Sequence, residues 1–202
     1  MEKFQNKYRI PSARHPYWDY RWPGAYFITI CTQNRVHYFG KINNGKMVLS
    51  NVGVIADILW HEIPHHAPNV ELGAFVVMPN HVHGILILTE NGNDNDNDNV
   101  TVETLHATSL PLSQPPTDQS FQPIRSYQNE PMAKISPKPN SVSTIVRSYK
   151  SAVTKHARRL GLEFAWQSRF HDHIIRDTKS FNRITHYIIN NPANWREDKF
   201  FK

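Results

Sequence analysis

The sequence has 202 residues, of which 39% are hydrophobic and 20% are charged, as is typical of a globular domain with its own core. No run approaches the roughly 20 apolar residues of a membrane span, and the charged, proline-interrupted N-terminus lacks the apolar stretch of a secretory signal. The single cysteine, Cys31, excludes an internal disulfide and a cysteine-rich zinc site. We therefore expect a cytoplasmic protein that does not enter membranes.

Positive charge is concentrated at the two ends of the sequence. Residues 1–50 hold 8 Lys and Arg against 2 Asp and Glu, and residues 141–202 hold 12 against 5, whereas the segment between them is acidic. A fold that brings the two ends together would present a basic surface, which suits a polyanion such as nucleic acid. An ordinary solvated surface explains the same charges equally well.

The residues before position 90 alternate between strand and helix patterns. They predict a strand over 25–32, a hairpin over 36–50 with its turn at 43–45, a helix over 52–63, and two paired strands over 70–78 and 81–88. Asn51 is expected to cap the helix. Its apolar face is predicted to consist of Val54, Ile55, Ile58 and Leu59.

The composition changes abruptly at residue 91. The stretch 91–99 reads NGNDNDNDN, and residues up to 140 are rich in Pro, Ser, Thr and Gln with few apolar clusters. Such a segment cannot bury enough surface to offset the entropy of ordering it. We expect a disordered insertion at 91–140 within a single domain that spans residues 1–202.

The remaining residues predict a helix over 142–160, a strand over 164–177 and a last helix that ends or kinks at Pro192. Thr178 or Ser180 is the expected cap of the last helix. The inward positions are predicted to be Val142, Ile145, Tyr149 and Val153 in the first helix, and Phe181, Ile184 and Ile188 in the second. Strand pairs mixed with helices indicate an α+β fold in which helices pack on an antiparallel sheet.

His81 and His83 are the first candidate site residues. Side chains two apart on a strand point to the same face, about 6.5–7 Å apart along it, so two imidazoles can converge on one metal ion. Val82 between them is expected to point into the core. A His-x-His pair is common by chance, but this one follows an apolar strand and a Met-Pro-Asn turn, which places it at the start of a strand.

Tyr187 and Asn191 are the second pair, because positions i and i+4 of a helix share one face. A tyrosine can attack a phosphodiester and form a covalent phosphotyrosine, and a divalent metal ion assists by polarising the phosphate. Two imidazoles and one amide oxygen suit Mg²⁺ or Mn²⁺. A half-buried helical tyrosine without chemistry fits the spacing of Tyr187 as well, and Pro192 disfavours a helical Asn191.

These residues together resemble a known family. The stretch FVVMPNHVHGILIL at 75–88 is similar to the HUH strand pair of the IS200-like tyrosine transposases, especially their REP-associated, single-domain (Y1) branch. The stretches SYKS at 148–151, WQSRFHDHIIRD at 166–177 and HYIINNP at 186–192 resemble its basic helix, its next strand and its tyrosine helix, in the right order.

The resemblance implies a ferredoxin-like or RRM-like fold and a single-strand DNA endonuclease that nicks and joins DNA at or near hairpins. Tyr187 would be the nucleophile that forms a 5′-phosphotyrosine, with His81 and His83 as metal ligands and Asn191 where relatives place a further ligand. The partner would be hairpin-forming single-stranded DNA, and the protein a monomer or homodimer. The Gly-Thr-Ser motif of many REP-associated members is absent, since Pro23-Gly24-Ala25-Tyr26 occupies the comparable place.

Other residues carry weaker expectations. Phosphate contacts are assigned to Arg147, Lys150, Arg158 and Arg159, although a solvated helix face explains each of them nearly as well. His173 is a candidate support for the metal or a phosphate, or an ordinary edge-strand histidine. Tyr149 is the second candidate nucleophile, with a core role favoured by its helical phase. Unpaired bases could stack on aromatic residues of the N-terminal arm, namely Trp18, Tyr20 and Trp22, or these residues could pack the arm itself.

Two other functions stay open. The first is a domesticated nucleic-acid-binding protein without catalytic turnover. The second is a metal-dependent hydrolase that uses only His81 and His83, for which a nearby carboxylate is required and none lies in their strand.

Overall fold

The structure is a computed structural model that describes residues 18–90 and 139–201. Most of the predicted insertion, residues 91–138, lies outside the described residues. Within the described ranges, no helix combines the length and the apolar character that a membrane crossing needs.

Four strands form the central sheet: β1 (Gly24–Cys31), β4 (Val70–Met78), β5 (His81–Leu88) and β6 (His171–Ile175). Their order is β4-β5-β1-β6 and every neighbouring pair is antiparallel. Together with the helices between them, this order is that of a ferredoxin-like sheet. The predicted α+β class is therefore confirmed.

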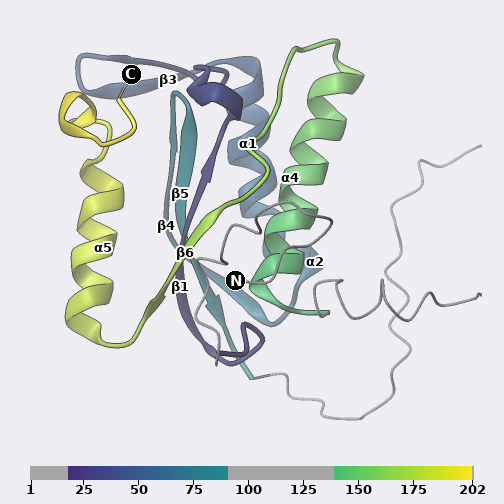
Figure 1. Cartoon of the computed structure of the whole chain (residues 1–202), viewed down its shortest axis with the longest axis vertical. Helices are drawn as coiled ribbons and strands as arrows, with labels where there is room; N and C mark the ends of the chain where they lie inside the picture. Colours follow the sequence, from purple (N-terminus) through teal and green to yellow (C-terminus); the bar gives the residue numbers. More distant parts are fainter. Residues whose placement is uncertain (1–17, 91–138, 202) are drawn as a thin grey trace, which may run out of the picture. The chain divides into compact units, whose positions relative to one another are not determined.

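Helices cover both faces of this sheet (Figure 1). α1 (Asn51–His61) and α4 (Val142–Arg159) lie together on one face, with the short α2 (Ile63–His66) beside them, and α5 (Thr178–Asn190) lies on the other face. The remaining elements are a separate β2–β3 hairpin (Gly40–Asn43 and Lys46–Leu49) and two 3₁₀ turns, η1 (Gln33–Arg35) and η2 (Trp195–Glu197). The hairpin turns at Asn44-Gly45, where both φ angles are positive, as the sequence predicts.

The core beneath α1 and α4 is built around Trp60. Its ring stacks on Phe75 with centroids 4.6 Å apart and meets Tyr149 edge-on at 5.3 Å. The Tyr149 hydroxyl donates to the Ala56 carbonyl over 2.9 Å, so this tyrosine is a core residue. Gly84 lies directly under Trp60, and only a residue without a Cβ leaves room for the indole there.

The apolar face predicted for α1 is right in half of its residues. Ile55 and Leu59 are partly buried against the core, but Val54 and Ile58 are exposed, and the fully buried positions are Val52, Gly53, Ala56 and Trp60. The cap is Ser50 rather than Asn51, since its hydroxyl accepts from the Gly53 amide. The buried stripe is centred on the large Trp60 side chain, and Ile55 and Leu59 lie at its edge.

The predicted strand over 164–177 is shorter in the structure. Only β6 is regular, because residues 164–170 form a loop whose one strand-like pairing is a bridge from Trp166 to Thr32, just after β1. The cap of α5 is Asp177, one residue before the predicted Thr178, and its carboxylate accepts from the Ser180 amide. The inward positions of α4 and of α5 are buried or partly buried as predicted.

We expect Gly84→Ala to lower the free energy of unfolding by about 1–3 kcal/mol, because the added methyl group would overlap the Trp60 ring. Urea denaturation measures the change. The control is Ser148→Ala on the exposed side of α4, which should stay within about 0.5 kcal/mol of wild type. A Gly84→Ala protein as stable as wild type would contradict this account of the core.

Candidate active site

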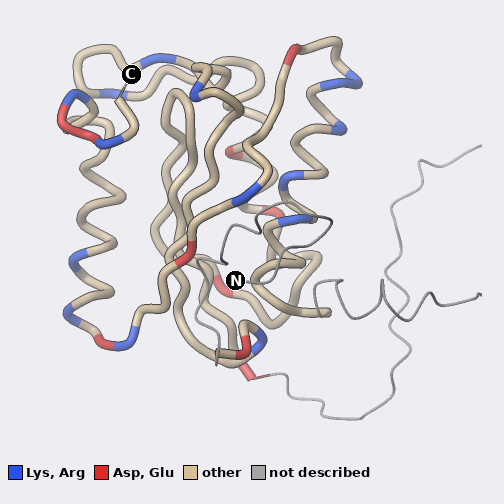
Figure 2. The backbone as a smooth tube through the Cα atoms, viewed as in Figure 1, with Lys and Arg blue, Asp and Glu red and all other residues tan. Residues whose placement is uncertain are grey.

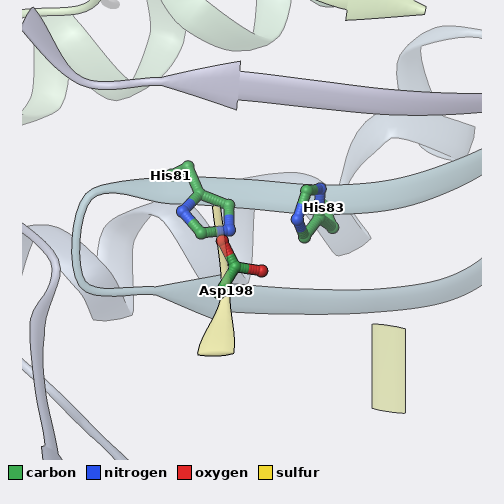
Figure 3. Close-up of side chains that lie close together, drawn as sticks. All are labelled: His81, His83 and Asp198. Atoms are coloured by element: carbon green, nitrogen blue, oxygen red, sulfur yellow. The ribbon is translucent and has the colours of Figure 1, made fainter. Parts of the chain in front are cut away.

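His81 and His83 lie side by side at the start of β5, with ring centroids 4.4 Å apart. Their side chains share the α5 face of the sheet, while Val82 points into the core on the other face, as predicted. Both rings are fully buried. Figure 3 shows the two side chains on β5, with the side chain of Asp198 next to them.

Each imidazole is held at its Nδ1 atom by a neighbouring polar group. His81 Nδ1 lies 2.8 Å from Asn80 Oδ1, and the Asn80 amide nitrogen donates to the Phe200 carbonyl. Because Asn80 Oδ1 only accepts, His81 must carry its proton on Nδ1. His83 Nδ1 lies 2.9 Å from the Thr29 hydroxyl, directly opposite in β1. Such partners fix the ring orientation and direct each Nε2 atom toward the site.

Tyr187 and Asn191 reach the histidines from α5. The Tyr187 hydroxyl lies 3.2 Å from His83 Nε2. Asn191 keeps helical angles (φ −56°, ψ −42°) although Pro192 follows it, so the expected conflict does not arise. Its side chain donates to Asp198 over 2.8 Å. The predicted residues of β5 and α5 are therefore brought together.

Asp198 completes this cluster, and no sequence pattern singles it out. Its carboxylate accepts from the Tyr187 hydroxyl at 2.9 Å as well as from Asn191. Possible ligand atoms of His81, His83 and Asp198 lie within 4.8 Å of one another. Asp198 lies beyond Pro192, in a segment without periodicity, and only the return of the chain over the sheet places it here.

Two buried atoms of the cluster have no hydrogen-bond partner among the described residues: His81 Nε2 and Asn191 Oδ1. Each offers a lone pair, since His81 is protonated on Nδ1 and the Asn191 amide nitrogen is used by Asp198. Unsatisfied buried acceptors are costly and call for an explanation. Nitrogen and oxygen lone pairs beside a carboxylate fit a divalent cation, so these residues fit the metal that the resemblance implies.

Burial dominates the electrostatics of the site. It lowers the pKa of His81 to about 3 and that of His83 well below its usual value, so both rings are neutral at neutral pH, as metal binding requires. The pKa of Tyr187 is raised, first by burial and then by the charge and the hydrogen bond of Asp198. The phenol is therefore protonated in this arrangement.

The C-terminal residues cover the histidine pair. The Phe200 ring lies 4.5 Å from His81 and 5.7 Å from His83 between centroids, and Trp195 lies 6.0 Å from His81. Phe200 and Trp195 also pack with Cys31 and Met78 in a small apolar cluster. The imidazoles are thus sealed from solvent by the last turn of the described chain.

The predicted DNA-contacting residues lie elsewhere. Arg147, Arg158 and Arg159 are exposed on α4, across the sheet from α5. Figure 2 marks Lys and Arg positions in blue at intervals along this helix. Lys150 is partly buried, and its ammonium group donates to the backbone carbonyls of Gln167 and Ser168. The structure does not bring these four residues to Tyr187.

His173 is exposed on β6, opposite Phe27 of β1. His171 is also exposed and pairs with Thr29, the residue that holds His83. Paired residues share a face, so both β6 histidines lie on the α5 side of the sheet. In the N-terminal arm, Tyr20 is buried, while Trp18 donates to the Tyr26 hydroxyl and Trp22 is half exposed.

We expect Phe200→Ala to open the histidine pair to solvent. Diethyl pyrocarbonate should leave His81 and His83 of the wild type unmodified, because both are fully buried, and should modify them in the variant. Mass spectrometry of the peptides measures the labelling. Phe201→Ala is the matched control, since Phe201 is 48% exposed and should change nothing at these histidines. Unlabelled His81 in a folded Phe200→Ala protein would show that other residues seal the site.

Acid should destabilise the metal-free protein through His81. Its folded pKa of about 3 lies below the ordinary value of about 6.5, so below pH 6.5 the unfolded chain binds a proton that the folded chain does not. Stability is then lost as the pH falls from 6.5 toward 3. From pH 8 to pH 5, His81 alone should lower the free energy of unfolding by about 2 kcal/mol.

Urea denaturation in EDTA measures this loss, and His81→Gln should reduce the pH dependence by about that amount. Ser148→Ala, which removes an exposed side chain that does not titrate, serves as the control and should keep the pH dependence of the wild type. Equal slopes for His81→Gln and wild type would show that the His81 ring does not stay neutral in the fold.

Three comparisons bear on the family. No protein-family model matches the sequence. An uncharacterised protein of Haemophilus influenzae is 36% identical over 191 residues, which cover 94% of this chain and 92% of that protein. The structure is similar to that of a REP-associated tyrosine transposase bound to a REP hairpin, with a TM-score of 0.53, 19% identity, and coverage of 94% of this chain and 77% of that one.

A candidate transposase of Deinococcus radiodurans is also similar, at 15% identity over 90% of this chain and 97% of that one, but its TM-score of 0.37 supports no conclusion. At 19% identity, the likeness to the REP-associated enzyme establishes a shared fold. The chain therefore belongs to the same family as the Haemophilus influenzae protein, and it has the fold of a REP-associated tyrosine transposase, the group that its motifs resemble.

Proposed function

We propose that the chain is a metal-dependent single-strand DNA endonuclease and transposase that uses Tyr187 as its nucleophile. The observation that carries this proposal is that the Tyr187 hydroxyl lies 3.2 Å from His83 Nε2 and shares the Asp198 carboxylate with Asn191, while ligand atoms of His81, His83 and Asp198 lie within 4.8 Å of one another. The histidines come from β5, and Tyr187 and Asn191 come from α5. The family that the motifs resemble likewise combines metal-binding histidines on a strand with a nucleophilic tyrosine on a later helix.

The reaction is a transfer of a phosphodiester to the phenol. The Tyr187 oxygen attacks the phosphorus, the bond to the 3′ oxygen breaks, and that oxygen takes up a proton and leaves as a free 3′-hydroxyl. The product is a 5′-phosphotyrosine on Tyr187, and attack on it by another 3′-hydroxyl joins DNA ends and frees the enzyme. The phenol proton faces the carboxylate of Asp198, the acceptor in hydrogen-bond contact with it.

A metal ion, Mg²⁺ or Mn²⁺, would supply polarisation of the phosphate and neutralisation of charge. His81, His83 and Asn191 are its proposed ligands, with Asp198 as an additional oxygen donor. Asn80 and Thr29 orient the two imidazoles from behind. Since the charge of Asp198 raises the pKa of Tyr187, positive charge near the carboxylate would favour release of the phenol proton.

The proposed substrate is single-stranded DNA that forms hairpins. The REP-associated transposase of the same fold is bound to a REP hairpin, which supports hairpins as the first substrates to test. Arg147, Arg158 and Arg159 would hold phosphates away from the cut, and His173 would face a strand that runs along the α5 side of the sheet. We further propose that residues 1–202 act as one domain, as a monomer or homodimer in the cytoplasm.

Incubation of the protein with end-labelled hairpin DNA and Mn²⁺ should produce a covalent protein–DNA adduct that survives denaturing electrophoresis. Tyr187→Phe should abolish it, because no other described hydroxyl contacts His83 Nε2. Tyr149→Phe should retain it, since Tyr149 is buried against Ala56 in the core, although it costs about 1 kcal/mol of stability. An adduct that persists in Tyr187→Phe would refute the nucleophile.

One observation favours a second candidate, a metal-dependent hydrolase that needs no tyrosine. Such an enzyme requires a carboxylate beside the histidines, and Asp198 supplies one. Metal-dependent cleavage that survives Tyr187→Phe without a covalent adduct would establish it. DNA binding without metal dependence and without cleavage of any hairpin would instead indicate the non-catalytic binding protein.

A further inference from the structure

A pocket of about 480 Å³ lies beside the histidine site and plays no part in the chemistry above. One wall is η1, with Gln33, Asn34 and Arg35, and the other is the loop before β6, with Trp166, Gln167 and Ser168. We call it the Trp166 pocket. Its volume lies in the range of small-molecule and cofactor sites, roughly 300–1,000 Å³.

The two walls are tied together by backbone hydrogen bonds. The Gln33 amide donates to the Ala165 carbonyl and the Gln167 amide donates to the Cys31 carbonyl, both over 2.9 Å. The Lys150 ammonium group adds hydrogen bonds to the carbonyls of Gln167 and Ser168. The pocket therefore exists before any ligand arrives, which reduces the entropy cost of binding.

Arg35 is the residue that points to an anionic ligand. Its Nη1 atom is buried and has no hydrogen-bond partner among the described residues. The guanidinium carbon lies 4.2 Å from the centre of the Phe200 ring, which holds the side chain in place. Arg35 and Asn34 also have positive φ angles, 59° and 53°, and such strained conformations tend to occur at binding sites.

The other lining groups suit an unpaired base. Amide side chains of Gln33, Asn34 and Gln167 can each donate and accept, which is what the edge of a base requires. Trp166 offers an aromatic surface at the wall, and its ring is fixed from behind by Phe39 and Phe164 at 5.3 and 4.9 Å. None of the six lining residues is acidic, so nothing in this wall repels a phosphate.

The pocket also lies next to the proposed site of cleavage. Cys31 at the end of β1 pairs with His81, and the Thr32 amide donates to the Asn80 carbonyl. Phe200 touches both sides, since it lies against Arg35 on one and His81 on the other. A DNA strand whose phosphate reaches Tyr187 would thus have a neighbouring nucleotide within reach of the pocket.

We propose that the Trp166 pocket binds one unpaired nucleotide of the DNA strand next to the cleaved phosphate. The base lies against Trp166 and is read by the amides of Gln33, Asn34 and Gln167, and the phosphate of that nucleotide is bound by Arg35. This inference rests on the proposed function for the identity of the ligand as DNA. It adds a residue-level source of base preference outside the hairpin.

The test is a selection for binding, which does not require cleavage. Full-length protein is mixed with DNA hairpins that carry randomised single-stranded arms, and the bound DNA is sequenced. Wild type should enrich one base at one position of an arm. Gln167→Ala should lose that preference, because Gln167 is exposed and its removal leaves the fold intact. Asn51→Ala, an exposed amide at the start of α1, is the control and should keep it.

Arg35→Gln should weaken binding of the selected DNA roughly tenfold and reduce the slope of log Kd against log salt by about one, as expected for one lost phosphate contact. An abasic site at the selected position should remove most of the difference between wild type and Gln167→Ala. If Gln167→Ala kept the base preference and Arg35→Gln kept the salt slope of the wild type, the proposal that the Trp166 pocket binds a nucleotide would be overturned. Wild-type binding without any base preference would overturn it as well.

The two proposals fail in different ways. A Tyr187 adduct with no change in the pocket variants would refute the pocket and leave the endonuclease standing. A base preference that depends on Gln167, without any Tyr187 adduct, would keep the pocket and refute the nuclease. Absence of any binding to the single-stranded arms would overturn both.

Discussion

The site depends on two hydrogen bonds that are made behind it, at the Nδ1 atoms of His81 and His83. Asn80 and Thr29 occupy these atoms, so both Nε2 atoms face the same small volume. Without them, each ring could turn and the His81 ring could change tautomer, so the two Nε2 atoms would no longer converge. The partners are themselves fixed, Thr29 by its place in β1 and Asn80 by the Phe200 carbonyl. These few polar contacts in the sheet thus fix the positions of the two Nε2 atoms, toward which α5 and the C-terminal segment direct their own polar side chains.

The two faces of the central sheet have different roles in holding these histidines. The α1 and α4 side holds the large core, in which Trp60 fills the space above Gly84. The α5 side holds a smaller apolar cluster around Ile184 and Ile188, and the polar site lies at one end of it. The same strands carry side chains of the large core on one face and the histidines on the other. Packing of the core therefore also fixes the backbone that holds the histidines. The separation also explains why the basic side of α4 is not part of the cluster around Tyr187.

Much of this was predictable from local patterns. The buried faces of α4 and α5 follow hydrophobic periodicity, and the His81/His83 and Tyr187/Asn191 pairs follow from the periods of a strand and of a helix. Three features were not. The buried stripe of α1 is centred on Trp60, which leaves Val54 and Ile58 of the expected face exposed. The aromatic loop at 164–170 mimics a strand in composition but pairs through one bridge. Asp198 belongs to no periodic segment, and only tertiary folding brings its carboxylate to Tyr187.

The histidines and the tyrosine are far apart in the chain: 104 positions separate His83 from Tyr187. The residues before position 90 contain both imidazoles together with Asn80 and Thr29, and those after 139 contain Tyr187, Asn191 and Asp198. The first part of the chain alone therefore holds only one half of the cluster. The cluster is assembled only when α5 and the segment after it have folded onto the sheet, so the histidines wait for residues that are made about a hundred positions later.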